Sequence, residues 1–87
     1  METRIAVISI IVEKPEAAAA LNELLHQYSQ YIIGRMGIPY RERGISIISI
    51  ALDAPDNTIS SLAGKIGNLS GVSVKTAYSS VKGASHG

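Results

Sequence analysis

Three arginines spread around a Gly- and Pro-containing segment are the residues best suited to binding chemistry. Arg35, Arg41 and Arg43 flank the sequence Gly37-Ile38-Pro39-Tyr40. A guanidinium presents a planar fork of N–H donors, so these residues predict an anion or small-ligand contact where subunits meet. For Arg41 and Arg43 we favour the alternative of a solvated hairpin tip, with Glu42 partly balancing the charge. Arg35 is the stronger candidate because its neighbours are apolar residues or glycine.

A second candidate lies where the first apolar run ends. Pro15 suits the first turn of a helix, and backbone N–H groups at such a start can bind anions. Lys14 precedes that start, although an ordinary charged loop is the favoured alternative. Gly37, with Gly34, indicates either an irregular edge strand or a place where a ligand approaches the backbone. The candidate ligand-binding residues are Glu13, Lys14, Arg35, Gly37 and Tyr40.

The sequence contains no recognisable catalytic constellation. We find no acid–base pair, nucleophile elbow or phosphate loop, so no catalytic residue is assigned and an enzyme is not expected. Cysteine is absent, which excludes disulfides and thiolate metal sites. His26 has no second ligand at helical spacing, and we expect it to interact with a helix dipole rather than with a metal. Neither a metal nor a cofactor is expected.

The composition narrows the class of partner. The 87 residues suffice for one domain, and a net charge of +1 provides no strong field for nucleic acid or an acidic membrane. The chain is 46% hydrophobic but only 17% charged, below the average of roughly 25%, as expected if much of the surface is an interface. The first residues lack the features of a signal peptide, and the apolar runs are too short to span a bilayer. We therefore predict a cytoplasmic protein.

Two runs are apolar on both faces of the strands that they predict. Residues 5–12 read IAVISIIV and residues 45–52 read ISIISIAL, whereas a half-buried strand alternates apolar and polar residues. A chain this short cannot cover both sides of a sheet by itself. We therefore predict a homo-oligomer, a dimer or a tetramer, in which another copy covers the second side. The predicted interface residues are Ile5, Val7, Ile11, Ile45 and Ile47.

The periodicity along the chain predicts four strands and two helices. The expected strands cover residues 4–12, 31–40, 45–52 and 72–78. The expected helices lie between them, the first over 15–28 and the second ending before Gly71, with Asp53 or Asp56 as its cap. Gly44 is expected to take a positive φ in the turn before the third strand.

The element order β-α-β-β-α-β defines the expected fold. Right-handed crossovers place both helices on one face of a four-stranded antiparallel sheet, with the first and third strands in the centre. The second strand contains Pro39 and is expected at an edge, because proline cannot donate to a ladder. The prediction is an α+β ferredoxin-like (ACT-like) βαββαβ sandwich that forms a single domain over residues 1–82. Residues 83–87 are expected to form a flexible tail.

The chain also resembles known families. The element order, the Lys14-Pro15 junction and the segment 71–74 resemble the ACT-like small-molecule regulatory domains. More specifically, residues 34–46 and 62–72 resemble the small stand-alone iron-only hydrogenase system regulators, a likeness that extends over about 5–80. This resemblance implies a link to the expression or maturation of iron–iron hydrogenase.

Two properties of related domains are not implied. Amino-acid-binding ACT domains carry a glycine at the first strand–helix junction, and Glu13-Lys14-Pro15 lacks one. The effector domain of the nickel-responsive repressor uses histidines and a cysteine where this chain has residues 35–38, RMGI. We expect a non-catalytic regulatory or sensing protein that binds a small effector or a protein partner. A structural or adaptor oligomer without a ligand is the alternative.

Overall fold

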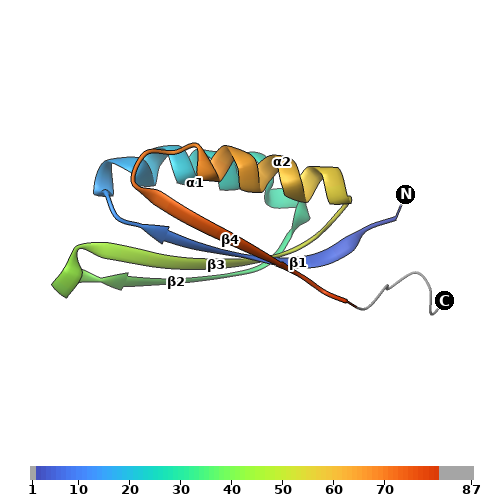
Figure 1. The fold of residues 1–87 in the computed structure, drawn as a ribbon, viewed down its shortest axis with the longest axis horizontal. Coiled ribbons are helices and arrows are strands. Elements are labelled where there is room, and N and C mark those ends of the chain that lie inside the picture. The colour runs from blue at the N-terminus through green and yellow to red at the C-terminus, as the bar shows by residue number, and fades with distance from the viewer. Residues whose placement is uncertain (1, 81–87) are drawn as a thin grey trace.

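The computed structural model describes residues 2–80 as one antiparallel sheet with two helices packed on one of its faces (Figure 1). The strands are β1 (Arg4–Val12), β2 (Ile32–Tyr40), β3 (Ile45–Ala54) and β4 (Val72–Tyr78). The helices are α1 (Ala18–Gln27), preceded by a 3-10 turn at Pro15–Ala17, and α2 (Asp56–Gly67). The strand order is β2-β3-β1-β4, which confirms the predicted α+β βαββαβ sandwich with β1 and β3 in the centre. The predicted domain boundary at 82 and the predicted tail lie outside the described residues.

The strand register divides each strand into an inner and an outer row. Ile8 pairs with Ile50 on the inner side, and both side chains are fully buried against the helices. The helices complete this core with residues at helical spacing, in α1 Leu21 and Leu25 and in α2 Ile59, Leu62 and Ile66. Burial of these aliphatic side chains is the main stabilising contribution to the fold.

The predicted cap of the second helix is wrong. β3 continues past Asp53 to Ala54, and α2 begins at Asp56 without a side-chain cap. The N-cap residue is Pro55, whose carbonyl accepts hydrogen bonds from the backbone N–H groups of Thr58 and Ile59. Proline serves here because its fixed φ directs the chain from an extended strand into a helix.

Gly71 takes a different place from the one predicted. α2 ends at Gly67, and Gly71 lies in the turn that leads into β4, with a φ of 77°. At the same end of the sheet, Gly44 has a φ of 66° after the short 3-10 turn Arg41–Arg43, as predicted. Both positions are in the left-handed region, where glycine has no Cβ penalty.

β2 is an edge strand, as predicted, and its pairing with β3 is irregular. The register shifts between Ile32 and Gly34, which leaves one extra residue in β2 at that point. Beyond the shift, Arg35, Gly37 and Pro39 occupy the inner row, opposite Ile50, Ile48 and Ser46 of β3. Within residues 2–80, no helix combines the length and the apolar character that crossing a bilayer requires.

Candidate functional site

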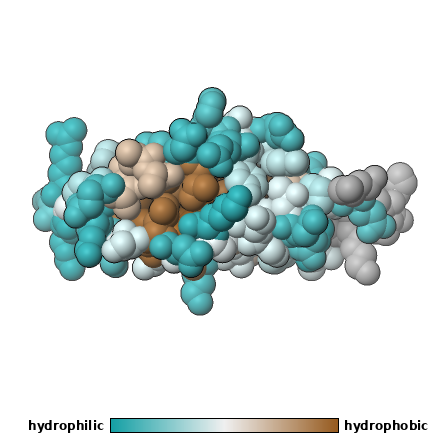
Figure 2. Space-filling view, turned by 90° about the horizontal axis from the view of Figure 1, so that it is seen from above, coloured by the Kyte–Doolittle hydropathy of each residue, from teal (hydrophilic) through white to brown (hydrophobic). Residues whose placement is uncertain are grey.

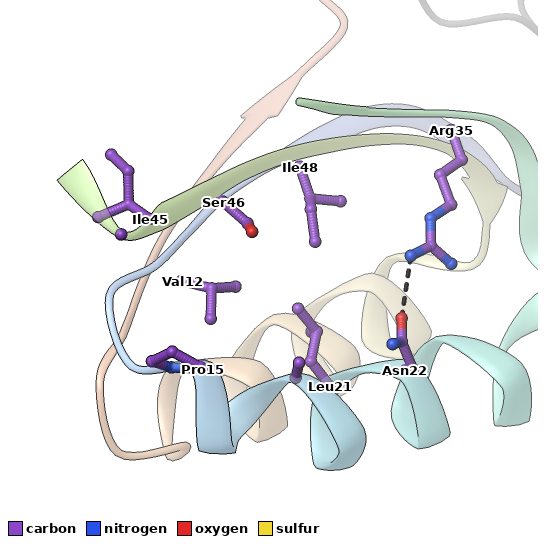
Figure 3. A pocket seen from close by; sticks show the side chains of 10 residues that line it. Val12, Pro15, Leu21, Asn22, Arg35, Ile45, Ser46 and Ile48 are labelled. Atoms are coloured by element: carbon purple, nitrogen blue, oxygen red, sulfur yellow. Dashed lines mark hydrogen bonds between the residues drawn. The ribbon is translucent and has the colours of Figure 1, made fainter. Parts of the chain in front are cut away.

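A cavity of about 370 Å³ lies between the start of α1 and the inner rows of β1, β2 and β3. Val12, Ser46 and Ile48 line it from the sheet. Pro15, Leu21 and Asn22 line it from the helical layer, and Arg35 reaches toward it from β2 (Figure 3). The interior is mostly aliphatic, and its polar groups are the side chains of Asn22, Arg35 and Ser46.

Beside the cavity, the inner row of β2 carries little bulk. Gly37 has no side chain, and a Cβ placed there would have Ile48 Cγ1 as its nearest neighbour at 4.0 Å. Pro39, the next inner residue, presents only its compact ring. The space between the sheet edge and α1 is therefore not filled as a close-packed core would be.

Arg35 is held in place by a partner on the helix. Its Nη2 donates a hydrogen bond of 2.9 Å to Oδ1 of Asn22 (Figure 3). A guanidinium has five N–H donors, so most of this donor capacity is left for a ligand. Among the lining residues Arg35 is the one charged side chain, and no carboxylate shares the cavity with it.

The structure does not gather all the predicted ligand-binding residues at this cavity. Arg35 lines it, whereas Gly37 is not one of its lining residues and lies on the inner row opposite the lining residue Ile48. Tyr40 lies in the outer row of β2, opposite Ile45, and so on the other face of the sheet. Lys14 lines a separate hollow of about 270 Å³ with Glu16, Ala17, Ala20, Leu69 and Ser70. The backbone N–H of Glu13 donates to the carbonyl of Gly71 at 2.7 Å.

Sequence reasoning missed Asn22 and the position of Ser46. Asn22 follows the buried Leu21 on α1, and Ser46 interrupts the apolar third strand. Polar residues at such positions are frequent on any helix or strand, so neither gave a signal by itself. The packing of α1 on the sheet brings both to the cavity that Arg35 lines.

A second feature is the outer face of the sheet, which the helices do not cover (Figure 1). Nine large hydrophobic side chains are exposed in the described residues, and seven of them lie on this face. These seven are Ile5, Val7, Ile11, Met36, Ile38, Tyr40 and Ile47. Ile45, half-buried, lies in the same row as Ile47, so all five predicted interface residues share this face.

The two faces of the molecule differ in polarity. Seen from the helical side, the surface is largely hydrophilic, with one compact hydrophobic area (Figure 2). The outer sheet face carries charge only near its margins in the described residues, at Lys75 on β4 and at Asp53 at the end of β3. At its centre Ser9 of β1 is paired with Ser49 of β3. We call this surface the open sheet face.

A polar cluster lies on the helical side, away from the cavity. Lys65 Nζ donates to Tyr28 Oη at 2.9 Å, and Ser61 Oγ lies 3.3 Å from the same oxygen. The hydrogen bond from Lys65, followed by that from Ser61, lowers the pKa of the Tyr28 hydroxyl below its usual 10.0. In the part of the chain that the structure describes, no three His, Asp or Glu side chains come together to hold a metal ion.

Comparisons with known proteins agree with this architecture. Residues 4–76 match the TM1266-like family, described as iron-only hydrogenase system regulators. The uncharacterized protein TM1266 from Thermotoga maritima has a similar structure, with a TM-score of 0.85 and 41% identity, over 88% of this chain and 98% of that one. No curated protein matches the chain.

Two further structures share the fold at low identity. The C-terminal domain of the MgtC protein from Mycobacterium tuberculosis has a TM-score of 0.71 and 12% identity over 93% of each chain. A formyltetrahydrofolate deformylase from Pseudomonas putida has a TM-score of 0.61 and 13% identity, over 84% of this chain and 28% of that one. At such identities the likeness concerns the fold alone.

Proposed function

The chain belongs to the TM1266-like family of iron-only hydrogenase system regulators, and from this membership we propose that it is a cytoplasmic, non-catalytic regulatory protein. We further propose that it works as a homo-oligomer whose subunits meet through the open sheet face. In this role the protein binds an effector, and the binding changes its action on other components of the hydrogenase system.

The open sheet face is the observation that supports assembly. Seven exposed hydrophobic side chains on one face are more than scattered surface residues, and such patches mark interaction sites. Ile47 is 41% exposed and Val7 37% exposed, although both lie on the two central strands. Central positions of a sheet face are the ones that a packed partner removes from water.

The size of the face suits a dimer. Strands about 4.8 Å apart, with a rise of about 3.4 Å per residue, give a four-stranded face roughly 19 Å wide and 27 Å long. The accessible surface of such a corrugated face exceeds its projected area of about 500 Å² and approaches the roughly 800 Å² per partner of a stable interface.

A second copy of this chain is the occupant that the face fits best. The centre of the face is uncharged, so two copies pack without bringing like charges together in the dry part of the contact. Two-fold packing also lets the same apolar rows serve both partners, which is the usual arrangement in homodimers. Lys75 and Asp53 remain near the margins, where water reaches them.

The oligomeric state in solution tests this proposal. Native mass spectrometry and light scattering should find a dimer or a tetramer for the wild type and a folded monomer for Ile47→Lys. Burying a lysine without a partner costs several kcal/mol, which is more than about a hundredfold in the dissociation constant. Ala19→Lys, at an exposed position of α1, is the matched control and should assemble as the wild type does.

Two results would contradict assembly through this face. One is a wild type that remains monomeric at the concentrations used for structural work. The other is an Ile47→Lys variant that assembles like Ala19→Lys. If Ile47→Lys fails to fold, Ile38→Lys on the edge strand, 50% exposed, places the same charge on the face with less effect on the sheet.

The link to iron-only hydrogenase requires a test in the host. Deletion of the gene should change the level or the activity of the hydrogenase, and restoring the chain should reverse the change. The Ile47→Lys variant, expressed at the same level, should fail to restore it. A hydrogenase that is unaffected by the deletion would exclude the regulatory role in that host, while an effect that needs no small ligand would favour the adaptor alternative.

A further inference from the structure

We propose that the cavity between α1 and the β2–β3 hairpin binds a small aliphatic monocarboxylate, with Arg35 holding the carboxylate. This inference deepens the regulatory role proposed above, on which its biological meaning rests, by naming the chemical class of the effector. The charge, the hydrogen-bond donors and the shape of the cavity support this assignment.

The charge of the cavity favours a monoanion. Arg35 is its one charged lining residue, and no carboxylate neutralises the guanidinium there. The described residues contain one ion pair, between Arg4 and Asp56, at the far end of β1. Arg35 therefore has no acidic partner in residues 2–80, and a bound anion would supply one. A charge-assisted hydrogen bond of this kind is stronger than a neutral one.

The guanidinium of Arg35 is already oriented before a ligand binds. The bond from Arg35 Nη2 to Asn22 Oδ1 anchors one arm of the guanidinium across the cavity. Because Arg35 is held before binding, less side-chain entropy is lost when a ligand binds. The hydroxyl of Ser46 also points into the cavity from β3 (Figure 3), but Ser46 lies four residues along the strand from Ile50, the partner of Arg35, so the carboxylate contact belongs to Arg35.

The walls favour a short hydrocarbon chain. Val12 and Leu21 are buried side chains that face the cavity from opposite layers, and Ile48 lies between them and Arg35 (Figure 3). No aromatic residue lines the cavity, so it has no stacking surface for a ring. A volume of about 370 Å³ is at the small end of ligand pockets, which favours a compact molecule.

These features distinguish a carboxylate from a phosphate. A carboxylate needs two parallel N–H donors, which one guanidinium supplies, and a hydrocarbon tail gains from apolar walls. A phosphate has more oxygens to satisfy and nothing to place against Val12 and Leu21. Inorganic phosphate is therefore expected to bind more weakly than a branched carboxylate.

The test is a titration of the full chain with isovalerate, followed by ¹H–¹⁵N NMR. The expected result is saturable shifts at Asn22, Arg35 and Ser46, with no comparable effect of isovaleramide or inorganic phosphate. Arg35→Gln should weaken binding at least about tenfold, the effect of losing one charge-assisted hydrogen bond. Arg41→Gln removes the same charge from the same hairpin, outside the cavity lining, and should change the affinity less than about twofold.

Four results would overturn the proposal. Three come from the titrations: the absence of saturable shifts, equal binding of isovaleramide or phosphate, and equal weakening by Arg35→Gln and Arg41→Gln.

The fourth result concerns the shape of the cavity. Gly37→Val adds a side chain on the inner row next to the lining residue Ile48, without backbone strain because the φ of Gly37 is not positive, and it should abolish binding by narrowing the cavity. Gly34→Val on the same strand should preserve it, and a Gly37→Val variant that still binds would contradict the site.

The oligomeric state, measured on the same samples, separates this inference from the proposed assembly. A wild type that assembles but does not bind isovalerate would overturn the carboxylate site alone. A monomeric wild type that binds isovalerate through Arg35 would support the site and contradict the sheet-face oligomer.

Discussion

Arg35 Nη2 lies 2.9 Å from Asn22 Oδ1, and this hydrogen bond joins the edge strand β2 to α1 across the mouth of a cavity. The two residues are 13 positions apart in the sequence and belong to different layers of the fold. The bond holds a guanidinium over aliphatic walls, which combines a localised charge with an apolar surface. This combination is the basis for the carboxylate site.

Asn22→Ala should weaken isovalerate binding by roughly fivefold, because a free Arg35 must lose about 1 kcal/mol of side-chain entropy on binding. Asn22→Asp should weaken it further, since a carboxylate at that position occupies the guanidinium and repels the ligand. The same NMR titration measures both effects. Gln27→Ala, another amide of α1 outside the cavity lining, is the control. An Asn22→Asp variant that binds as well as the wild type would show that Arg35 is not the anion contact.

Gly71→Ala should lower the free energy of unfolding by about 1–3 kcal/mol. The φ of Gly71 is 77°, and a Cβ there would lie 2.6 Å from Cγ of Lys14, so the substitution adds both strain and a clash. Gly64→Ala is the matched control. Gly64 lies inside α2 with open space around it, and there alanine should stabilise the protein by about 0.5–1 kcal/mol. Urea denaturation at one protein concentration measures both changes in the free energy of unfolding. A Gly71→Ala variant that is stabilised as Gly64→Ala is would contradict the turn geometry.

Truncation of adjacent residues on β1 should have different consequences. Ile8 is 0% exposed, and Ile8→Ala should lower the unfolding free energy by about 2–5 kcal/mol. Val7 lies in the outer row, and Val7→Ala should instead weaken subunit association, by about 2 kcal/mol per dimer since two-fold symmetry counts the loss twice. Unfolding and dilution experiments separate the effects. A Val7→Ala variant with the wild-type dissociation constant would place Val7 outside the interface.

The pKa of Tyr28 should rise toward 10.0 when its main hydrogen-bond donor is removed by Lys65→Gln. Ser61→Ala, which removes the second cause, should raise it less. Titration of the tyrosine by NMR measures both. Because the folded-state pKa lies below the unfolded value of 10.0, the stability contributed by ionising this hydroxyl is complete above pH 10.0 and is lost as the pH falls through the folded-state pKa. An unchanged pKa in Lys65→Gln would show that the Lys65 bond does not form in solution.

At some element boundaries the local sequence was sufficient to predict where a strand begins and ends. β1 begins and ends at Arg4 and Val12 as predicted, because a continuous apolar run bounded by Lys14-Pro15 leaves little choice. The start of the second helix could not be predicted from the local sequence. Asp53 and Asp56 are both good capping residues, yet β3 extends through Asp53 to pair with β1 at Ile5, and Pro55 takes the N-cap position. Strand pairing is a long-range contact, which local preference cannot report.

The sequence alone determined the fold class and the division of the central strands into two apolar faces. Hydrophobic periodicity, turn residues and the handedness of crossovers act locally and leave few alternatives for an 87-residue chain. Only the tertiary structure decided which polar side chains meet. The register of β2 on β3 turned Arg35 inward and Tyr40 outward, and the packing of α1 supplied Asn22. A one-residue shift of that register would reverse both faces, so the cavity depends on pairing and packing between distant segments.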